Sequence, residues 1–196
     1  MRNKNLGNLI KTSLLGVIAF LIMYLNFMLP MMPNFLLFDF SDIAALIGAF
    51  SLGPVYGVLI ELVKNILHGL FVGGTGFVGE LANFLVGAFF VFTAGLIYKR
   101  KKTKKGALES LAAASIVMVI VSGILNVYVF LPLYAKVLGW NLDAIVGASA
   151  KANPMITDMK TYIFLAILPF NAIKAIVHSI ITLSLYKKVS PILKQK

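Results

Sequence analysis

The feature that most constrains the fold is a series of long apolar segments separated by short polar, glycine- or proline-containing stretches. Six such segments can be drawn, at residues 9–29, 40–52, 55–71, 77–98, 108–134 and 161–186. A helix needs about 20 apolar residues to cross the hydrocarbon core of a bilayer. The second and third segments are shorter and could be tilted or partly re-entrant. The pattern predicts an all-α membrane protein with six transmembrane helices in a single bundle, forming one domain over residues 1–196.

Composition supports this class of protein. Hydrophobic residues make up 60% of the chain and charged residues only 13%, with a mean hydropathy of +0.93. About a quarter of the residues of a typical soluble domain are charged, so a water-soluble fold of this length would lack the polar side chains to cover its surface. There is no cysteine. Disulfides, thiolate catalysis and cysteine-ligated metals are therefore excluded.

The net charge of +11 would suggest nucleic-acid binding in a soluble protein, but its distribution indicates a membrane protein. Six of the 18 basic residues lie in "KRKKTKKG", residues 99–106. The chain ends carry seven more, Arg2, Lys4, Lys11, Lys187, Lys188, Lys194 and Lys196. Cytoplasmic flanks of membrane proteins are enriched in lysine and arginine and attract anionic lipid. We expect both termini in the cytoplasm, a multi-pass location in the cell membrane and no nucleic-acid partner.

The last apolar segment contains the most informative polar residues. In "LPFNAIKAIVHS", residues 168–179, Asn171, Lys174 and His178 are spaced to share one helix face. A charge near mid-bilayer costs about 3 kcal/mol, so it faces the bundle interior, a cavity or a partner. Two interpretations stay open for Lys174: a ligand contact together with Asn171 in an outward-facing cavity, or a structural pair with a buried carboxylate. For His178 we expect a structural interhelical hydrogen bond.

Two other segments place polar groups at a similar level. "GELANF" puts Glu80 and Asn83 three residues apart on one helix face, and we expect Glu80 to be the counter-charge of Lys174. Either residue could also contact a ligand. Asn126 stands alone in an apolar run and could form a third wall of the same cavity. An isolated asparagine can equally hydrogen-bond between helices for structural reasons.

The third segment carries charges that can neutralise one another. In "ELVKNILH", Glu61 can pair with Lys64, or Lys64 with His68, within one helix. A different class of function, a membrane-embedded enzyme using Glu61 or His178 as an acid or base, is also conceivable. The sequence contains no phosphate-binding loop, zinc motif or nucleophile elbow. We therefore predict no enzyme activity, no catalytic residues, no metal site and no cofactor.

Several stretches together resemble a known family. "FDFSDIAALIGAFSLGPVYGVLIELVKNILH", "GFVGELANFLVG" and "PFNAIKAIVH" are similar to the riboflavin-binding S component of energy-coupling factor (ECF) vitamin transporters. The resemblance covers nearly the whole chain. It implies high-affinity binding of riboflavin, as transported substrate, in a pocket that opens outward. The ligand contacts that it implies are Asn126, Asn171, Lys174, Glu80, Asn83, Leu37, Phe38, Phe40, Thr75 and Gly76.

The resemblance also implies partners, namely a transmembrane coupling subunit and two cytoplasmic ATPase subunits. The family's small-residue docking pattern on the first helix corresponds here to Thr12, Gly16 and Ala19, which could serve docking or packing within the bundle. The nearest alternative function is the same architecture with another vitamin or with the phosphorylated flavin FMN as ligand.

Overall fold

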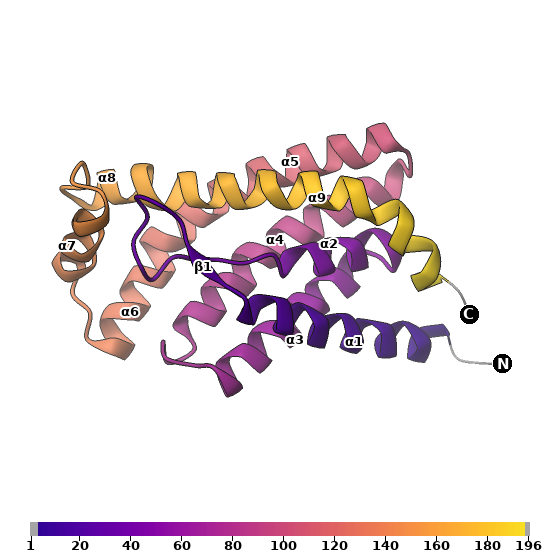
Figure 1. Ribbon diagram of the computed structural model, residues 1–196, viewed down its shortest axis with the longest axis horizontal. Helices are drawn as coiled ribbons and strands as arrows, with labels where there is room; N and C mark the ends of the chain where they lie inside the picture. Colours follow the sequence, from indigo (N-terminus) through magenta and orange to yellow (C-terminus); the bar gives the residue numbers. More distant parts are fainter. Residues whose placement is uncertain (1–3, 195–196) are drawn as a thin grey trace.

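The computed structural model describes residues 4–194 (Figure 1). The regular structure in these residues is helical, apart from one short strand pair. The first half contains α1 (Lys4–Tyr24), β1 (Phe27–Met28), β2 (Leu37–Phe38), α2 (Asp42–Ser51), α3 (Pro54–Phe71) and α4 (Val78–Arg100). The second half contains α5 (Lys104–Leu125), a π-helical turn η1 (Asn126–Phe130), α6 (Leu131–Leu138), α7 (Leu142–Ala152), α8 (Met159–Tyr162), a second π-helical turn η2 (Ile163–Ile167) and α9 (Leu168–Lys194).

Five helices are long and apolar enough to cross a membrane. They comprise Asn5–Tyr24, Pro54–Phe71, Val78–Arg100, Lys104–Leu138 and Met159–Leu193, the last two running without a break through the π-helical turns. The predicted second span is α2, which has only 10 residues. At about 1.5 Å per residue such a helix is about 15 Å long, half the thickness of the hydrocarbon core. The described residues therefore give five candidate spans and a short internal helix in place of six full spans.

Helix α2 lies at the centre of the bundle. Every residue from Asp42 to Phe50 is buried, and α1, α3, α4 and α9 all pack against it. Small residues allow the close approach: a Cβ added at Gly57 on α3 would lie 2.6 Å from the Ala49 Cβ. The small residues of α2 and α3 therefore serve helix packing. A side chain larger than glycine at position 57 would push α2 and α3 apart.

The small residues of the first helix also allow close packing. Thr12 and Ala19 are buried, and a Cβ added at Gly16 would lie 2.5 Å from Cγ1 of Val63 on α3. The face predicted as a possible docking surface for a partner subunit is thus occupied by α3. Of the two uses that the sequence left open for Thr12, Gly16 and Ala19, the structure supports packing within the bundle.

Both π-helical turns are followed by a proline. Pro132 comes two residues after η1, and Pro169 two residues after η2. Proline has no N–H and its ring clashes with the carbonyl four residues earlier, which lies inside the π-helical turn in each case. Widening the helix there relieves the clash without breaking the span. Each long helix therefore carries an irregular turn in the same half of the bundle.

The loops in the half of the bundle that contains the π-helical turns have more regular structure than the sequence predicted. β1 and β2 pair antiparallel, with Phe27 opposite Phe38, and fold the first loop back over the bundle. α7 is an additional helix inside the loop before α8, and Asn141 caps its first turn. The following Asp158 caps α8, and hydrogen bonds from the Thr161 backbone and side chain hold the pKa of Asp158 below its usual value.

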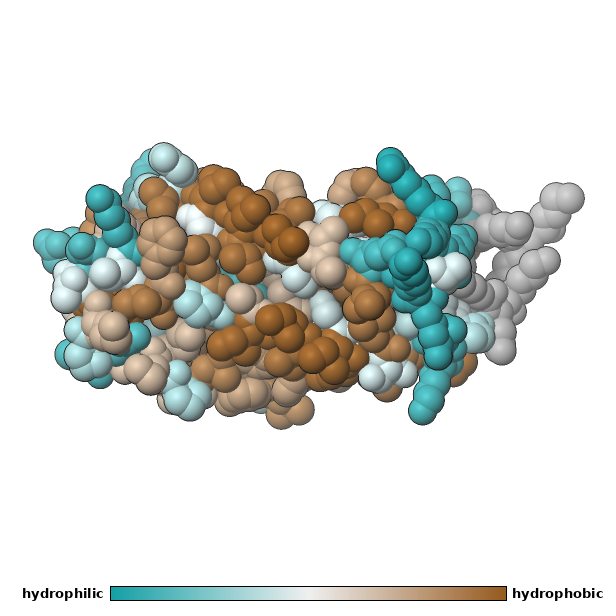
Figure 2. Space-filling view, turned by 90° about the horizontal axis from the view of Figure 1, so that it is seen from above, coloured by the Kyte–Doolittle hydropathy of each residue, from teal (hydrophilic) through white to brown (hydrophobic). Residues whose placement is uncertain are grey.

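The surface divides along the length of the molecule. The start of α1, the end of α9 and the α4–α5 turn lie at one end (Figure 1). Hydrophilic side chains gather at that end and also at the opposite end, and a broad apolar surface covers the middle (Figure 2). Large apolar side chains such as Leu14, Leu21, Ile116 and Ile180 are more than half exposed. An exposed apolar belt of this kind is suited to contact with lipid.

Candidate functional site: a polar cavity between α4, α5–α6 and α9

A cavity of about 140 Å³ lies between α4, the α5–α6 helix and α9, under the first loop. Five polar groups reach its wall: Asp42, Asn83, Asn126, Asn171 and Lys174. The remaining wall is largely apolar or aromatic, formed by Phe35, Leu36, Leu37, Ala82, Val86, Met118, Phe130, Tyr134, Ile167 and Phe170, with Gly79 and Gly87. A mostly apolar chamber with a few converging polar groups is the usual form of a small-molecule site.

Asn83 contributes an unpaired acceptor to the cavity wall. Its Oδ1 atom is buried and has no hydrogen-bond partner within residues 4–194. Leaving a buried acceptor unpaired costs about 1–3 kcal/mol, so such groups are uncommon without a reason. Because Asn83 lines the cavity, a ligand carrying an N–H or O–H group can satisfy this acceptor.

The irregular turns bring the other two asparagines to the wall. Asn126 is the first residue of η1, and Asn171 follows η2 by four residues. Asn171 Nδ2 donates to the Ile167 carbonyl oxygen over 2.9 Å, which fixes the orientation of its amide. Single-turn π-helical insertions are frequent at functional sites, and here they lie on both long helices beside the cavity.

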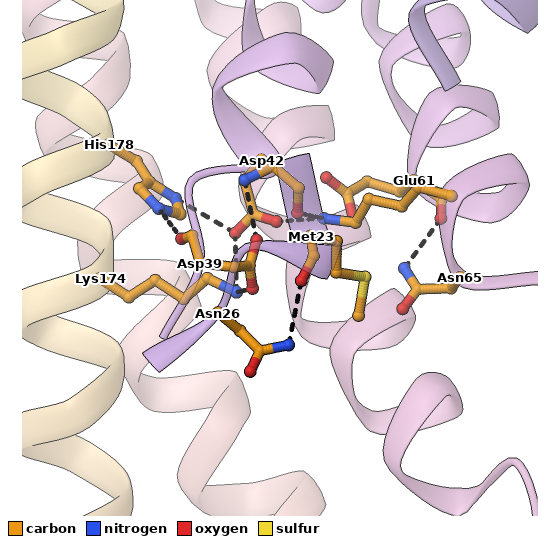
Figure 3. Close-up of polar contacts among 10 residues, drawn as sticks. Met23, Asn26, Asp39, Asp42, Glu61, Asn65, Lys174 and His178 are labelled. Atoms are coloured by element: carbon orange, nitrogen blue, oxygen red, sulfur yellow. Dashed lines mark hydrogen bonds and ion pairs between the residues drawn. The ribbon is translucent and has the colours of Figure 1, made fainter. Parts of the chain in front are cut away.

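Lys174 reaches the cavity from α9 and is paired with two carboxylates (Figure 3). Its Nζ lies 3.2 Å from Asp39 Oδ2 and 3.4 Å from Asp42 Oδ2, and the side chain is only 4% exposed. The prediction that Glu80 is the counter-charge of Lys174 is wrong. Asp39 precedes α2 and Asp42 begins it, so the partners come from the central helix and the segment before it.

The same carboxylates connect to two further helices. Asp42 also binds Lys64 on α3, and Lys64 lies 2.8 Å from Glu61 Oε2, which confirms one of the two pairings predicted within that helix. On α9, His178 Nε2 donates to the Asp39 carbonyl oxygen over 2.8 Å, and Nδ1 lies 3.2 Å from Asp42 Oδ2 (Figure 3). The prediction of a structural hydrogen bond for His178 is confirmed, but the acceptor lies in the segment before α2 and not on another helix.

This charged cluster contains three carboxyl groups, those of Asp39, Asp42 and Glu61, and two ammonium groups, those of Lys64 and Lys174. An uncompensated buried charge is very costly. Its carboxyl groups outnumber its ammonium groups by one, so the cluster is balanced when one carboxyl group is neutral. A cluster that is neutral as a whole can lie inside the bundle at a tolerable energetic cost.

Glu80 takes part in a separate polar group. Its Oε1 lies 3.0 Å from His68 Nδ1, and its Oε2 accepts a hydrogen bond from Thr75 Oγ1 over 2.8 Å. His68 therefore pairs with Glu80, so the alternative pairing of His68 with Lys64 is wrong. Glu80 and Gly76 line a different hollow of about 350 Å³, between α3, α4 and α6, whose wall is almost entirely apolar.

The predicted ligand contacts thus divide into two sets. Asn83, Asn126, Asn171, Lys174 and Leu37 line the polar cavity. Phe38 and Phe40 pack their rings against His178 instead, at centroid distances of 5.6 and 6.3 Å. Thr75, Gly76 and Glu80 lie beside the apolar hollow or in its wall.

Sequence reasoning missed Asp42 and Tyr134, which also line the cavity. The signal for Asp42 was present: an acidic residue begins a short and otherwise largely apolar helix, which has to lie inside the bundle. Buried charges require partners, and the buried lysines of the third and sixth segments were the available ones. Tyr134 gave no comparable signal, because aromatic residues are common throughout the chain.

Fold and cavity together define a polytopic membrane protein with an internal polar chamber, and comparisons with known proteins identify its family. Residues 7–186 match the ECF transporter, substrate-specific component. The riboflavin transporter RibU of Staphylococcus aureus (strain TCH60) is 42% identical over 187 residues, covering 95% of this chain and 92% of that protein. The riboflavin transporter FmnP of Bacillus subtilis (strain 168) is 34% identical over 192 residues, covering 96% and 94%.

A solved structure agrees with these relatives. It is described as "Structure and mechanism of the S component of a bacterial ECF transporter" and superposes with a TM-score of 0.75 at 39% identity, covering 98% of this chain and 100% of that one. The chain belongs to the family of substrate-specific (S) components of ECF transporters. It is a multi-pass membrane protein of a transport system and not an enzyme.

Proposed function

We propose that this protein is the riboflavin-binding S component of an ECF-type vitamin uptake transporter in the plasma membrane. The single observation that carries the proposal is the unpaired Asn83 acceptor in the wall of a cavity that also presents Asn126, Asn171 and Lys174. The relatives named as riboflavin transporters, which align with nearly the whole chain, support the choice of ligand.

The chemistry of the cavity suits a flavin. Its isoalloxazine ring is flat and largely apolar, with an imide at one edge, that is, an N–H between two carbonyl groups, and its ribityl chain carries hydroxyl groups. Amides can both donate to and accept from such groups, while the Lys174 ammonium can only donate. The aromatic residues Phe35, Tyr134 and Phe170 offer surfaces against which the ring can pack.

Size adds a requirement. Cavities that hold drug-sized ligands usually measure about 300–1,000 Å³, more than the 140 Å³ of this cavity. Admission of a flavin therefore requires part of the wall to move outward. The segment that carries Phe35, Leu36 and Leu37 is the candidate, because it lines the cavity and lies outside the helices.

The topology follows from the distribution of charge. We propose that the end of the molecule bearing Lys11, Lys187, Lys188 and the 99–105 basic cluster faces the cytoplasm, with the cavity toward the outside. Arg2 and Lys196, which also entered the charge argument, lie outside the described residues. A sixth crossing would consist of α2 together with the extended segment that precedes it. Residues 1–196 would then form one six-helix substrate-binding domain with both termini inside.

The protein would deliver riboflavin together with a transmembrane coupling subunit and two cytoplasmic ATPase subunits. The family assignment as a substrate-specific component supports a division of labour of this kind. Because the small-residue face of α1 is covered by α3, docking would use other surfaces of the bundle, including the exposed apolar side chains of α1.

The test is a binding titration on the purified protein in detergent. Trp140 stacks on Tyr134, which lines the cavity, so its fluorescence should fall when a flavin binds. We expect saturable quenching by riboflavin, and about tenfold weaker binding by Asn83→Ala. Asn8→Ala, at the other end of the bundle, is the matched control. Saturable binding of another vitamin but not of riboflavin would overturn the ligand assignment, and stronger binding of FMN than of riboflavin would replace it.

A further inference from the structure

The carboxylates beside Lys174 suggest a role beyond charge balance. A lysine side chain has four rotatable methylene groups, so its ammonium has a fixed place only where partners hold it. Lys174 Nζ is held from two directions, by Asp39 Oδ2 at 3.2 Å and by Asp42 Oδ2 at 3.4 Å. An ammonium group has three donors. Asp39 Oδ2 accepts a hydrogen bond from one of them, and Asp42 holds the ammonium as an ion pair, so a donor remains for a ligand in the cavity that Lys174 lines.

Asp42 is itself held in place. It is 1% exposed, begins α2, and binds Lys64 on α3 through Oδ1 while Oδ2 faces Lys174 and His178 on α9. The positive end of the α2 dipole favours a carboxylate in this first turn. Asp39 is fixed in turn, because its Oδ1 accepts a hydrogen bond from the Ser41 backbone N–H over 2.8 Å. Both carboxylates are therefore rigid, as a group that orients another must be.

We propose that Asp39 and Asp42 are positioning residues of the ligand site, which hold the Lys174 ammonium at the cavity wall with one donor directed at the ligand. This inference rests on the proposed riboflavin function. It assigns to two acidic residues of the loop–α2 junction a contribution to affinity that is exerted through Lys174. The group that Lys174 meets would be an uncharged acceptor such as a ring carbonyl oxygen, because two carboxylates already surround the ammonium.

The proposal predicts non-additive effects on affinity. If Asp39 acts only by placing Lys174, its removal matters only while Lys174 is present. We expect Asp39→Asn to weaken riboflavin binding about tenfold in the otherwise unchanged protein. In a protein that already carries Lys174→Met, the same change should alter the dissociation constant less than about twofold. Asp42→Asn should follow the same pattern.

The experiment is a double-mutant cycle on purified full-length protein, with the riboflavin dissociation constant from Trp140 quenching as readout. The melting temperature without ligand is measured for each variant, since a merely structural role would lower stability without coupling to Lys174. Asp39→Asn is the primary variant because Asp39 lies outside the helices. Asp42→Asn, which changes the first residue of α2, is the secondary variant. If Asp42→Asn does not fold, the cycle with Asp39→Asn alone tests the positioning role.

The outcomes separate the two proposals. Tenfold weakening that vanishes beside Lys174→Met supports the positioning role. Equal weakening with and without Lys174, or no weakening by Asp39→Asn, overturns that role while leaving riboflavin binding intact. An unmodified protein that does not bind riboflavin overturns the proposed function, and this inference falls with it.

Discussion

The two hollows on either side of α4 differ in the groups that they present. The cavity toward α9 is lined by three amides, an ammonium group and a carboxylate. The larger hollow toward α3 and α6 is lined almost entirely by apolar side chains. Asn83 contributes to the first and Glu80 to the second, although they are only three residues apart on one helix. Size alone would favour the apolar hollow, but a ligand with many hydrogen-bonding groups requires the polar cavity.

Neighbouring residues of α4 allow the sharpest test of this difference. Ala82 lines the polar cavity and Leu81 lines the apolar hollow. Ala82→Trp should fill the smaller space and weaken riboflavin binding by about 100-fold or more, because overpacking leaves no room for the ligand. Leu81→Trp introduces the same indole one position earlier and should change the dissociation constant less than about twofold. Isothermal titration avoids interference from the added tryptophan, and the reverse order of effects would place the ligand in the apolar hollow.

Replacing the lysine of the polar cavity should have the next largest effect. Lys174→Ala removes a donor to the ligand and leaves Asp39 and Asp42 without their shared partner. Removing one member of a buried ion pair typically costs about 3–5 kcal/mol of stability. We expect riboflavin affinity to fall by roughly 10- to 100-fold while membrane insertion is retained. Fluorescence titration and a thermal melt measure the two effects, and an unchanged dissociation constant would remove Lys174 from the ligand site.

The two polar residues of α4 should respond differently to substitution. Asn83→Ala removes the unpaired acceptor and should weaken riboflavin binding about tenfold. Glu80→Gln keeps the shape of a side chain whose partners are His68 and Thr75, so its effect should stay below about threefold. If Glu80→Gln weakens binding as strongly as Asn83→Ala, Glu80 reaches the ligand in the complex, as the family resemblance first suggested.

The smallest effect is expected at Glu61, the residue of the charged cluster farthest from Lys174 along the chain of ion pairs. Glu61→Gln leaves Asp39 and Asp42 facing Lys64 and Lys174, so the cluster remains balanced without an additional proton. Riboflavin affinity should change less than about twofold, and stability should change by less than about 1 kcal/mol. A thermal melt checks the second expectation. A large loss of stability would show that the Glu61 carboxylate is required as an anion.

The sequence was sufficient for the five long helices and for much of the cavity wall. Long apolar runs gave the spans, and polar residues within them gave Asn83, Asn126, Asn171 and Lys174, because such residues are tolerated in a membrane only with an internal partner or cavity. It was not sufficient for the shape of the first loop, since the β1–β2 pair has only two residues in each strand.

The sequence was also not sufficient to identify the ion-pair partner of Lys174. Glu80 and Asp42 are both carboxylates that could neutralise Lys174 on charge alone, and only the position of α2 in the middle of the bundle decides between them. Glu80 and Asn83 illustrate the same limit on a smaller scale. Residues three apart on a helix are neighbours but point about 60° apart, which is enough to separate them into different hollows.

The central claim is that the polar cavity between α4, α5–α6 and α9 holds the flavin. An experimental structure of the purified protein with riboflavin bound tests it directly. The account predicts the isoalloxazine ring in that cavity, with Asn83 and at least one of Asn126, Asn171 and Lys174 within hydrogen-bond distance. A flavin seated in the apolar hollow beside Leu81 and Val137, or on the outer surface with those four side chains untouched, would contradict it.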